Sequence, residues 1–295
     1  MSKVITRIKG GLGNQLFCYA AARRLALIND AELVIDDLTG FSRDHQYRRH
    51  YSLEHFQIPV RKATPAERLE PLERYRRGIV KFISRKKSFE QRSYIEQIGN
   101  EFDARLLDLK IHGTVYVDGY WQSEDYFKDI EQTIREDLRI VPPIDSVNTD
   151  MAKIICERNA VAVHVRWFDD PSKETATHNA SKEYYLCAID KIRKYVENPY
   201  FFLFSDDPVA AQRILCLPAD EMTCVSHNKG DENAYADLWL MTQCKNFIIA
   251  NSTFSWWGAW LSLNGSKIII APNIKLTGHT SWGFDRQIPE RWLKL

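Results

Sequence analysis

Apolar and polar runs alternate along most of this 295-residue chain, a pattern typical of strands followed by helices. Short apolar runs rich in Val, Ile and Phe predict buried strands at 4–8, 33–35, 114–117, 160–165, 201–204, 222–225, 246–250 and 267–270. The stretches between them predict helices at 15–28, 123–138, 182–195, 208–215, 232–244 and over the tryptophan-rich segment 256–260. Strands that alternate with helices indicate parallel sheets covered on both faces.

A helix-breaking Val141-Pro142-Pro143 sequence separates two such blocks. We therefore expect an α/β protein with two Rossmann-like halves that face a cleft. The N-terminal domain would span 1–143, and the C-terminal domain would span 144–295.

Residues 61–92 depart from this rhythm, because they hold eleven Lys and Arg against four Glu. Two interpretations of this basic insertion stay open. It is either a solvated helical segment, or a surface that meets anionic lipid headgroups or a phosphate-linked acceptor. The second interpretation predicts peripheral contact with a membrane.

The composition, with 44% hydrophobic and 12% aromatic residues, can fill ordinary cores. A net charge of +1 argues against a nucleic-acid binder. The sequence shows neither a signal-peptide pattern nor a run of about 18 apolar residues, so we expect a cytoplasmic protein, at most attached to the inner face of a bacterial inner membrane. The histidines lack metal-ligand spacing and Asp-x-Asp is absent, which favours chemistry without a metal or other cofactor.

Small polar side chains gather directly after the predicted strand 246–250. They are Asn251, Ser252, Thr253 and Ser255, placed around Phe254. Hydroxyls and free backbone N–H groups at the start of a helix suit a phosphate. A Ser or Thr cap on an ordinary core helix is the alternative.

A glycine-rich turn, Gly10-Gly11-Leu12-Gly13-Asn14-Gln15, follows the first predicted strand. It lacks the last glycine of a dinucleotide fingerprint and the Lys of a phosphate-binding Walker loop. Its glycines let a ligand approach the backbone closely. Asn14 and Gln15 suit hydrogen bonds to a sugar or a phosphate.

Polar residues also follow two central strands of the second half. His164 and Arg166 are two apart on an extended chain, so they point to the same side, and Arg166 can bind a phosphate in a bidentate manner. A structural ion pair between Arg166 and Asp169 is the alternative. Asp206 follows the strand 201–204 and suits a base, a ribose or a helix cap, and Asp237 lies in an otherwise apolar helix.

These blocks resemble the α-1,2-fucosyltransferases of glycosyltransferase family 11, in their bacterial type. The resemblance runs nearly end to end. It rests on Gly10 to Phe17, Gly119-Tyr120-Trp121-Gln122-Ser123-Glu124, His164-x-Arg166, Phe204-Ser205-Asp206-Asp207, Asp237 to Met241 and Ile249 to Ala259.

The resemblance implies a GT-B-like fold, in which the N-terminal domain takes the acceptor and the C-terminal domain binds a GDP-activated sugar donor. It also implies that no metal takes part and that the anomeric carbon is inverted. In the wider superfamily the arginine of His-x-Arg contacts the donor diphosphate, and Ser-Thr-Phe contacts the phosphates and the base. Those roles fall on Arg166, Ser252, Thr253 and Phe254. The implied donor site further includes Gly11, Gly13, Asn14, Gln15, Asp206, Asp237, Asn251 and Ser255.

One departure concerns the donor sugar. The family pattern His-x-Arg-Arg-Gly-Asp reads here with Trp167 and Phe168 before Asp169, so that a cation and a glycine give way to two aromatic residues. More apolar walls suit a donor with fewer hydroxyls, such as colitose, but such walls discriminate weakly. L-Fucose therefore stays the expected donor, and GDP-L-colitose the alternative.

The expected reaction is one in-line displacement by the 2-hydroxyl of a galactose-terminated glycan, which can be lipid-linked, as in O-antigen synthesis. Arg166, the Ser252 and Thr253 hydroxyls and the helix N-terminus would stabilise the leaving diphosphate. Glu124, Asp36, Asp118 and His164 are the candidates for the general base. A protein that binds GDP-sugars or glycans without turnover is a further alternative.

Overall fold

The computed structural model describes residues 2–99, 101–170, 178–274 and 287–295. The chain divides into two compact units, Met1–Arg139 and Ile140–Leu295. The division falls close to the Pro142-Pro143 sequence. Both units are α/β, as the hydrophobic pattern predicts.

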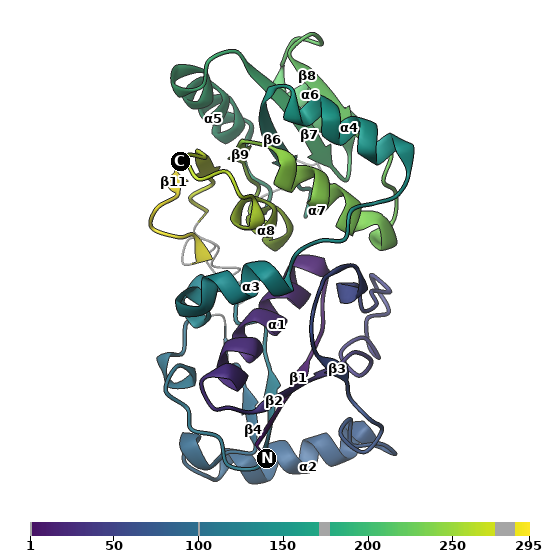
Figure 1. The fold of residues 1–295 in the computed structure, drawn as a ribbon, viewed down its shortest axis with the longest axis vertical. Coiled ribbons are helices and arrows are strands. Elements are labelled where there is room, and N and C mark those ends of the chain that lie inside the picture. The colour runs from purple at the N-terminus through teal and green to yellow at the C-terminus, as the bar shows by residue number, and fades with distance from the viewer. Residues whose placement is uncertain (1, 100, 171–177, 275–286) are drawn as a thin grey trace. The chain divides into compact units, whose positions relative to one another are not determined.

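The N-terminal unit contains a parallel sheet in the order β3-β2-β1-β5-β4 (Figure 1). Its strands are β1 (Lys3–Arg7), β2 (Glu32–Asp36), β3 (Arg61–Lys62), β4 (Tyr94–Glu96) and β5 (Thr114–Asp118). Its helices are α1 (Leu12–Leu27), α2 (Glu73–Arg85) and α3 (Glu131–Asp137), joined by 3₁₀ turns at Leu53–His55, Phe89–Gln91, Ala104–Leu106, Glu124–Tyr126 and Lys128–Ile130. A strand–helix alternation with parallel pairing is the Rossmann-like arrangement expected for this half.

The basic segment 61–92 connects strands at the two edges of this sheet. It begins with β3 at one edge, where Lys62 pairs with Ile35 of β2. It then forms α2, which leads to β4 at the opposite edge. The charge excess therefore lies on a crossover connection that packs against the sheet.

The predicted helix at 123–138 is wrong over its first half. Two 3₁₀ turns precede α3 there, and the backbone of Phe127 between them takes φ −148° and ψ 5°, outside the helical region. Tyr126 and Phe127 are both fully buried. Burial of two successive aromatic rings overrides the helical pattern of the sequence at this point.

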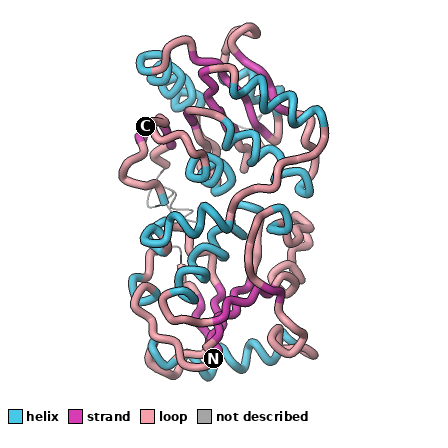
Figure 2. The backbone as a smooth tube through the Cα atoms, viewed as in Figure 1, coloured by secondary structure: helices cyan, strands magenta, loops and turns pink. Residues whose placement is uncertain are grey.

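The C-terminal unit contains a second parallel sheet, in the order β11-β10-β9-β6-β7-β8. Its strands are β6 (Asn159–Val165), β7 (Pro199–Ser205), β8 (Met222–Val225), β9 (Asn246–Ile248), β10 (Ile269–Ala271) and β11 (Leu293–Lys294). Its helices are α4 (Ser146–Cys156), α5 (Lys182–Tyr195), α6 (Pro208–Leu215), α7 (Ala234–Gln243) and α8 (Thr253–Leu261), with a 3₁₀ turn at Asp231–Asn233. Figure 2 shows the helices distributed around the magenta strands of this unit.

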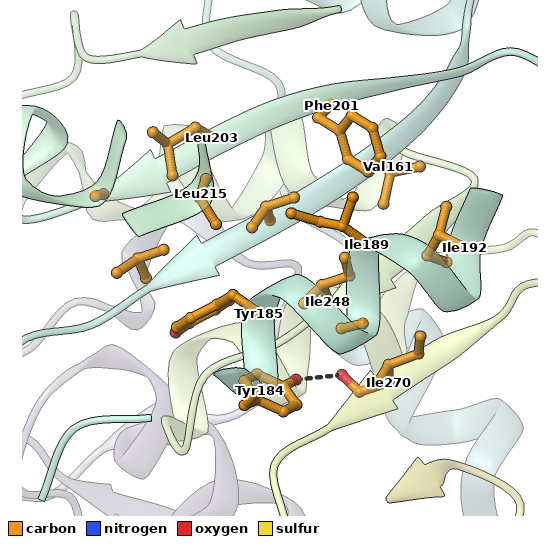
Figure 3. Close-up of a cluster of buried hydrophobic side chains, with 14 of the residues drawn as sticks. Val161, Tyr184, Tyr185, Ile189, Ile192, Phe201, Leu203, Leu215, Ile248 and Ile270 are labelled. Carbon is orange, nitrogen blue, oxygen red and sulfur yellow. Dashed lines mark hydrogen bonds between the residues drawn. The ribbon is translucent and has the colours of Figure 1, made fainter. Parts of the chain in front are cut away.

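Alternation along the strands sorts side chains between the two faces of this sheet. Val161, Val163 and Val165 of β6 enter one apolar cluster with residues of α5 and α6 (Figure 3). His164 has the opposite parity, so it lies on the other face. The Tyr184 hydroxyl of α5 donates to the backbone oxygens of Ile249, at 2.6 Å, and Ile270, at 3.0 Å.

Helix α8 carries the tryptophan-rich segment, and its rings form core. Trp256, Trp257 and Trp260 are at most 1% exposed, so these rings are buried in the core and are not available to stack on a sugar. A Cβ atom at Gly258 would lie 3.1 Å from the Met241 Cε atom of α7. The glycine therefore allows α7 and α8 to pack closely.

We expect Tyr184→Phe to lower the free energy of unfolding by about 1–2 kcal/mol, because buried backbone carbonyls lose a donor. Urea denaturation followed by tryptophan fluorescence measures this change, since seven of the eight tryptophans lie in the C-terminal unit. Tyr195→Phe is the matched control, because Tyr195 of the same helix is 65% exposed. Equal midpoints for the two variants would contradict the role of the Tyr184 hydroxyl.

Candidate functional site

An ion pair lies at the carboxyl edge of the C-terminal sheet. The register of β6 and β7 aligns Val165 with Ser205, so the next residues of both strands, Arg166 and Asp206, emerge side by side. The Arg166 Nη1 atom lies 2.9 Å from Asp206 Oδ2, and both side chains are about one-third exposed. Asp206 Oδ1 also accepts from the Trp167 backbone N–H, at 3.2 Å. So exposed a pair adds little stability, but it orients a guanidinium that has further donors to offer.

The two acidic residues after β7 have separate tasks. Asp207, rather than Asp206, caps helix α6, because its Oδ1 atom accepts from the Ala210 backbone N–H at 3.0 Å. Asp206 instead holds Arg166. The structural alternative of an Arg166–Asp169 pair is thereby replaced by a pair between neighbouring strands.

The polar cluster before α8 combines a cap with half-buried hydroxyls. Ser252 is the N-cap, and its Oγ atom accepts from the Phe254 backbone N–H at 3.3 Å. Thr253 follows it and is also half-buried. Ser255, by contrast, is fully buried and donates to the Ser252 carbonyl at 3.3 Å. Ser252 and Thr253 are therefore the partly exposed hydroxyls of the cluster, and Ser255 has a role in the turn.

Asp169 and Asn251 are linked through His178. Asp169 Oδ2 lies 2.8 Å from His178 Nδ1 and accepts from the His178 backbone N–H at 3.0 Å. The His178 carbonyl accepts from Asn251 Nδ2, at 2.8 Å. Asp169 therefore fixes the loop after β6 against the start of the polar cluster. His178 is a site component that the sequence reasoning did not identify, because nothing in its local pattern distinguishes it.

His164 is buried against the same cluster. Its ring centroid lies 5.6 Å from that of Phe254, and no described residue hydrogen-bonds to its Nδ1 atom. Burial, assisted by the nearby charge of Arg166, lowers the pKa of His164 to about 3. The imidazole is neutral at physiological pH and a weak base, so its environment suits packing beneath Phe254 better than proton abstraction.

The two aromatic residues after Arg166 differ in exposure. Trp167 packs against the apolar cluster of β6 and α5, and its Nε1 atom donates to the Asp207 carbonyl at 3.4 Å. Phe168 is exposed, and its ring centroid lies 5.7 Å from Arg166 Cζ. Of the two aromatic residues in the predicted donor-sugar pocket, Phe168 is therefore the exposed one, and it lies beside the guanidinium.

Asp237 of α7 belongs to a polar network around the end of β8. Its Oδ1 atom accepts from Asn228 Nδ2 at 2.8 Å, and Asn228 exchanges hydrogen bonds of 2.9 Å with Asn148. His227 Nε2 lies 3.0 Å from Asn148 Oδ1. Burial raises the pKa of Asp237 to about 7, so this carboxyl gains and loses a proton near neutrality. Sequence reasoning missed Asn148, His227 and Asn228, although a polar run directly after a short strand was available as a signal.

The glycine-rich turn of the N-terminal unit is held by Gln15. The Gln15 Nε2 atom donates to the carbonyls of Gly10, at 2.9 Å, and His50, at 2.8 Å, and its Oε1 atom accepts from the Ser52 backbone N–H at 2.9 Å. The side chain is 1% exposed. Gln15 thus shapes the turn. Its side-chain N–H groups already donate to two backbone carbonyls, so they are not free for the predicted hydrogen bond to the sugar donor.

Asn14 and the glycines occupy the start of α1. Asn14 Oδ1 accepts from Gln122 Nε2 at 2.7 Å, which joins the first block of the family resemblance to the second. A Cβ atom at Gly11 would lie 3.5 Å from Arg49 Cζ, so this glycine lets a guanidinium lie close to the backbone. Gly13 is buried in the first turn of the helix.

Two of the base candidates in this unit, Asp118 and Asp36, form ion pairs within the protein. Asp118 is buried among Arg7, Lys9 and Lys81, with Lys9 Nζ at 2.8 Å. Burial alone would raise its pKa, but the charges of Lys9 and Arg7 outweigh that effect and hold the pKa well below the usual carboxyl range.

Asp36 and Glu124 complete the set of candidates. Asp36 accepts from the Thr39 backbone N–H at 2.9 Å and from the Thr39 hydroxyl, and it pairs with Arg77 at 3.3 Å. Glu124 is half-buried and begins the 3₁₀ turn that follows β5 and the Gly119–Ser123 block. Of the three carboxylate candidates, it is the one that does not lie at the end of a β-strand.

Within the described ranges, no group of three or more His, Cys, Asp and Glu side chains is arranged to hold a metal ion. The described helices also include none long and apolar enough to cross a bilayer.

Comparisons with known proteins identify the family of the chain. A model of the family "Glycosyl transferase family 11" matches residues 76–282. The chain is 30% identical over 311 residues to an Escherichia coli protein named alpha-1,2-colitosyltransferase, with 100% of this chain and 99% of the relative covered. It is 28% identical to the E. coli O-antigen biosynthesis glycosyltransferase WbnK, over 98% of this chain and 99% of the relative.

A solved structure supports the fold. The NodZ α-1,6-fucosyltransferase, soaked with GDP-fucose, superposes with a TM-score of 0.52 at 18% identity, and the match covers 88% of this chain and 92% of NodZ. The likeness confirms a GT-B-like fold. Since the family model matches most of the chain and a bacterial relative matches it from end to end, the chain belongs to glycosyl transferase family 11.

Proposed function

We propose that this glycosyltransferase moves L-fucose from GDP-L-fucose to the 2-hydroxyl of a galactoside, with inversion and without a metal, during the synthesis of O-antigen or a related glycan. The observation that carries the proposal is Arg166, oriented by Asp206 at the carboxyl edge of the sheet. Strand β9, which leads to Ser252, is the other neighbour of β6. The ends of β6, β7 and β9 therefore bring a guanidinium and a helix N-terminus to one edge, where ligands of open α/β sheets bind.

This combination suits a diphosphate leaving group. Arg166 offers a planar set of donors that matches phosphate oxygens. The N-terminus of α8 adds backbone donors, a partial positive charge and the hydroxyls of Ser252 and Thr253. Both groups would stabilise the negative charge that develops on GDP as its bond to the sugar breaks, a task that a divalent metal performs in other transferases.

Asp237 is our proposed acceptor for the guanine base. A carboxylate can accept two parallel N–H donors from the edge of guanine, and a half-buried site strengthens such bonds. The amides of Asn228 and Asn148 beside it supply further polar groups for a base or ribose. The relatives support a GDP-sugar donor in general, because NodZ was soaked with GDP-fucose.

The proposed reaction is a single displacement. The acceptor 2-hydroxyl oxygen forms a bond to the anomeric carbon while the bond from that carbon to the diphosphate breaks. The hydroxyl proton passes to a carboxylate, and GDP leaves with the electron pair. We assign the base to Glu124, because it is a half-buried carboxylate directly after the Gly119–Ser123 block of the family resemblance. The buried His164 ring, with its lowered pKa, is a weaker base.

GDP-L-colitose is the second candidate donor, and two observations favour it. Phe168 presents an exposed ring beside Arg166, where an apolar wall suits a sugar with one hydroxyl fewer. The colitosyltransferase relative is 30% identical over the full length. The fucosyl and colitosyl products differ by one oxygen, so their masses distinguish the two donors.

In the deciding experiment, the protein is incubated with a β-galactoside and either GDP-L-fucose or GDP-L-colitose, in buffer with EDTA. The masses of the products are then measured by mass spectrometry. We expect transfer from GDP-L-fucose at a rate that EDTA does not change, and an α-1,2 linkage by NMR. Faster transfer from GDP-L-colitose would replace fucose by the second candidate. Binding of GDP without any product would leave a non-catalytic binding protein, and a strict need for added Mn²⁺ would contradict the metal-free mechanism.

The pKa of Asp237 predicts how base binding depends on pH. A carboxyl with a pKa of about 7 accepts hydrogen bonds from guanine only above that pH, so the affinity for guanosine should rise about tenfold between pH 6 and pH 8. Asp237→Asn should bind guanosine more weakly and without this rise, as measured by calorimetry. Asp231→Asn, at an exposed acid nearby, is the control. The same pH dependence in Asp237→Asn and the wild type would remove Asp237 from the base site.

A further inference from the structure

Helix α2 packs on the N-terminal sheet through polar side chains. Arg77, buried beneath the helix, pairs with Asp36 at 3.3 Å, and Lys81 pairs with Glu96 at 2.6 Å. The buried Ser84 hydroxyl accepts from the first backbone N–H of β4, at 3.0 Å. Ion pairs and hydrogen bonds therefore fix the inner side of this helix, where an ordinary surface helix would bury an apolar stripe.

The apolar side chains of α2 face outward instead. The exposed ones are Tyr75, Ile79, Phe82 and Ile83, together with Leu72 at the N-cap, each between 49% and 74% exposed. Their spacing of three and four residues places them along one side of the helix. In Figure 1, α2 lies at the rim of the N-terminal unit. We call these five residues the α2 stripe. A contiguous exposed stripe of this kind marks an interaction surface.

Cations flank the α2 stripe. Arg74, Arg76, Lys86 and Lys87 are all exposed, and the Lys86 Nζ atom lies 4.3 Å from the Phe82 ring centroid. No ion pair joins these four residues to any carboxylate among the described residues, although Arg76 donates to the Glu70 backbone oxygen. The helix thus offers apolar side chains bordered by positive charges that the protein itself leaves uncompensated.

We propose that α2 docks the protein on an anionic lipid surface, with the helix in the plane of the membrane. The aromatic and aliphatic side chains of the stripe would enter the boundary of the acyl chains, and the flanking Lys and Arg would meet the headgroups. Charge complementarity selects this partner. A second copy of the chain, paired symmetrically through the same helix, would set the same cations against each other.

The proposal holds whatever sugar the protein transfers, because its test measures binding to vesicles and uses no donor or acceptor. The full-length protein is mixed with vesicles of phosphatidylcholine alone or with one-third phosphatidylglycerol, and the bound fraction is measured by sedimentation. We expect binding to the anionic vesicles, weak binding to the neutral ones, and a loss of binding with added salt.

Two pairs of variants separate the contributions. Ile79→Ser with Phe82→Ser should weaken binding to anionic vesicles by at least about tenfold, because the stripe loses apolar area. Arg74→Ser with Lys87→Ser should weaken it by about tenfold at low salt. Val209→Ser with Leu263→Ser is the matched apolar control, since both residues are exposed in the C-terminal unit. Lys110→Ser with Lys229→Ser is the matched charge control.

Equal vesicle binding by the stripe variant and the wild type would overturn the proposal. An absence of vesicle binding by the wild type would overturn it as well. A concentration-dependent dimer that Ile79→Ser with Phe82→Ser disrupts would assign the stripe to a second copy instead. Circular dichroism spectra and thermal unfolding midpoints equal to those of the wild type would show that the variants keep their fold.

Discussion

The parallel pairing of β6 with β7 and β9 is the constraint on which the candidate site depends. Because the three strands run in the same direction and in fixed register, the residues after them meet at one edge of the sheet. This pairing sets Arg166 against Asp206 and brings the Ser252 cap of α8 close by. The apolar cluster on one face and the tryptophan core under α8 keep the strands in place, so that packing fixes the site while the exposed ion pair contributes little.

Much of this edge could be predicted from the sequence, because buried parallel strands are short apolar runs and polar residues directly after them stand out. The alternation of strands and helices gave the fold class, and the residue types after β6 and β9 gave the diphosphate proposal. The parity of His164 and Arg166 followed from their spacing. What the pattern could not give was the partner of Arg166, since Asp206 and Asp169 are equally plausible until the strand order is known.

The remaining features depend on burial, which a single sequence hides. Gln15 is a residue type that often binds ligands, yet its side-chain amide makes hydrogen bonds to three backbone groups of the protein itself. The raised pKa of Asp237 arises from its surroundings and not from its neighbours in sequence. Helix α2 shows the same point in reverse. Its charge excess was visible, but only the structure shows that Arg77 and Lys81 point inward and that the apolar side points outward.

The most direct test of the account compares the binding of GDP and guanosine to the wild type and to Arg166→Ala, by calorimetry in buffer with EDTA. If Arg166 holds the diphosphate, the variant should lose about 10–100-fold in affinity for GDP and nothing in affinity for guanosine. Arg213→Ala, at an exposed arginine of α6, should change neither value. An unchanged preference for GDP over guanosine in Arg166→Ala would contradict the central claim.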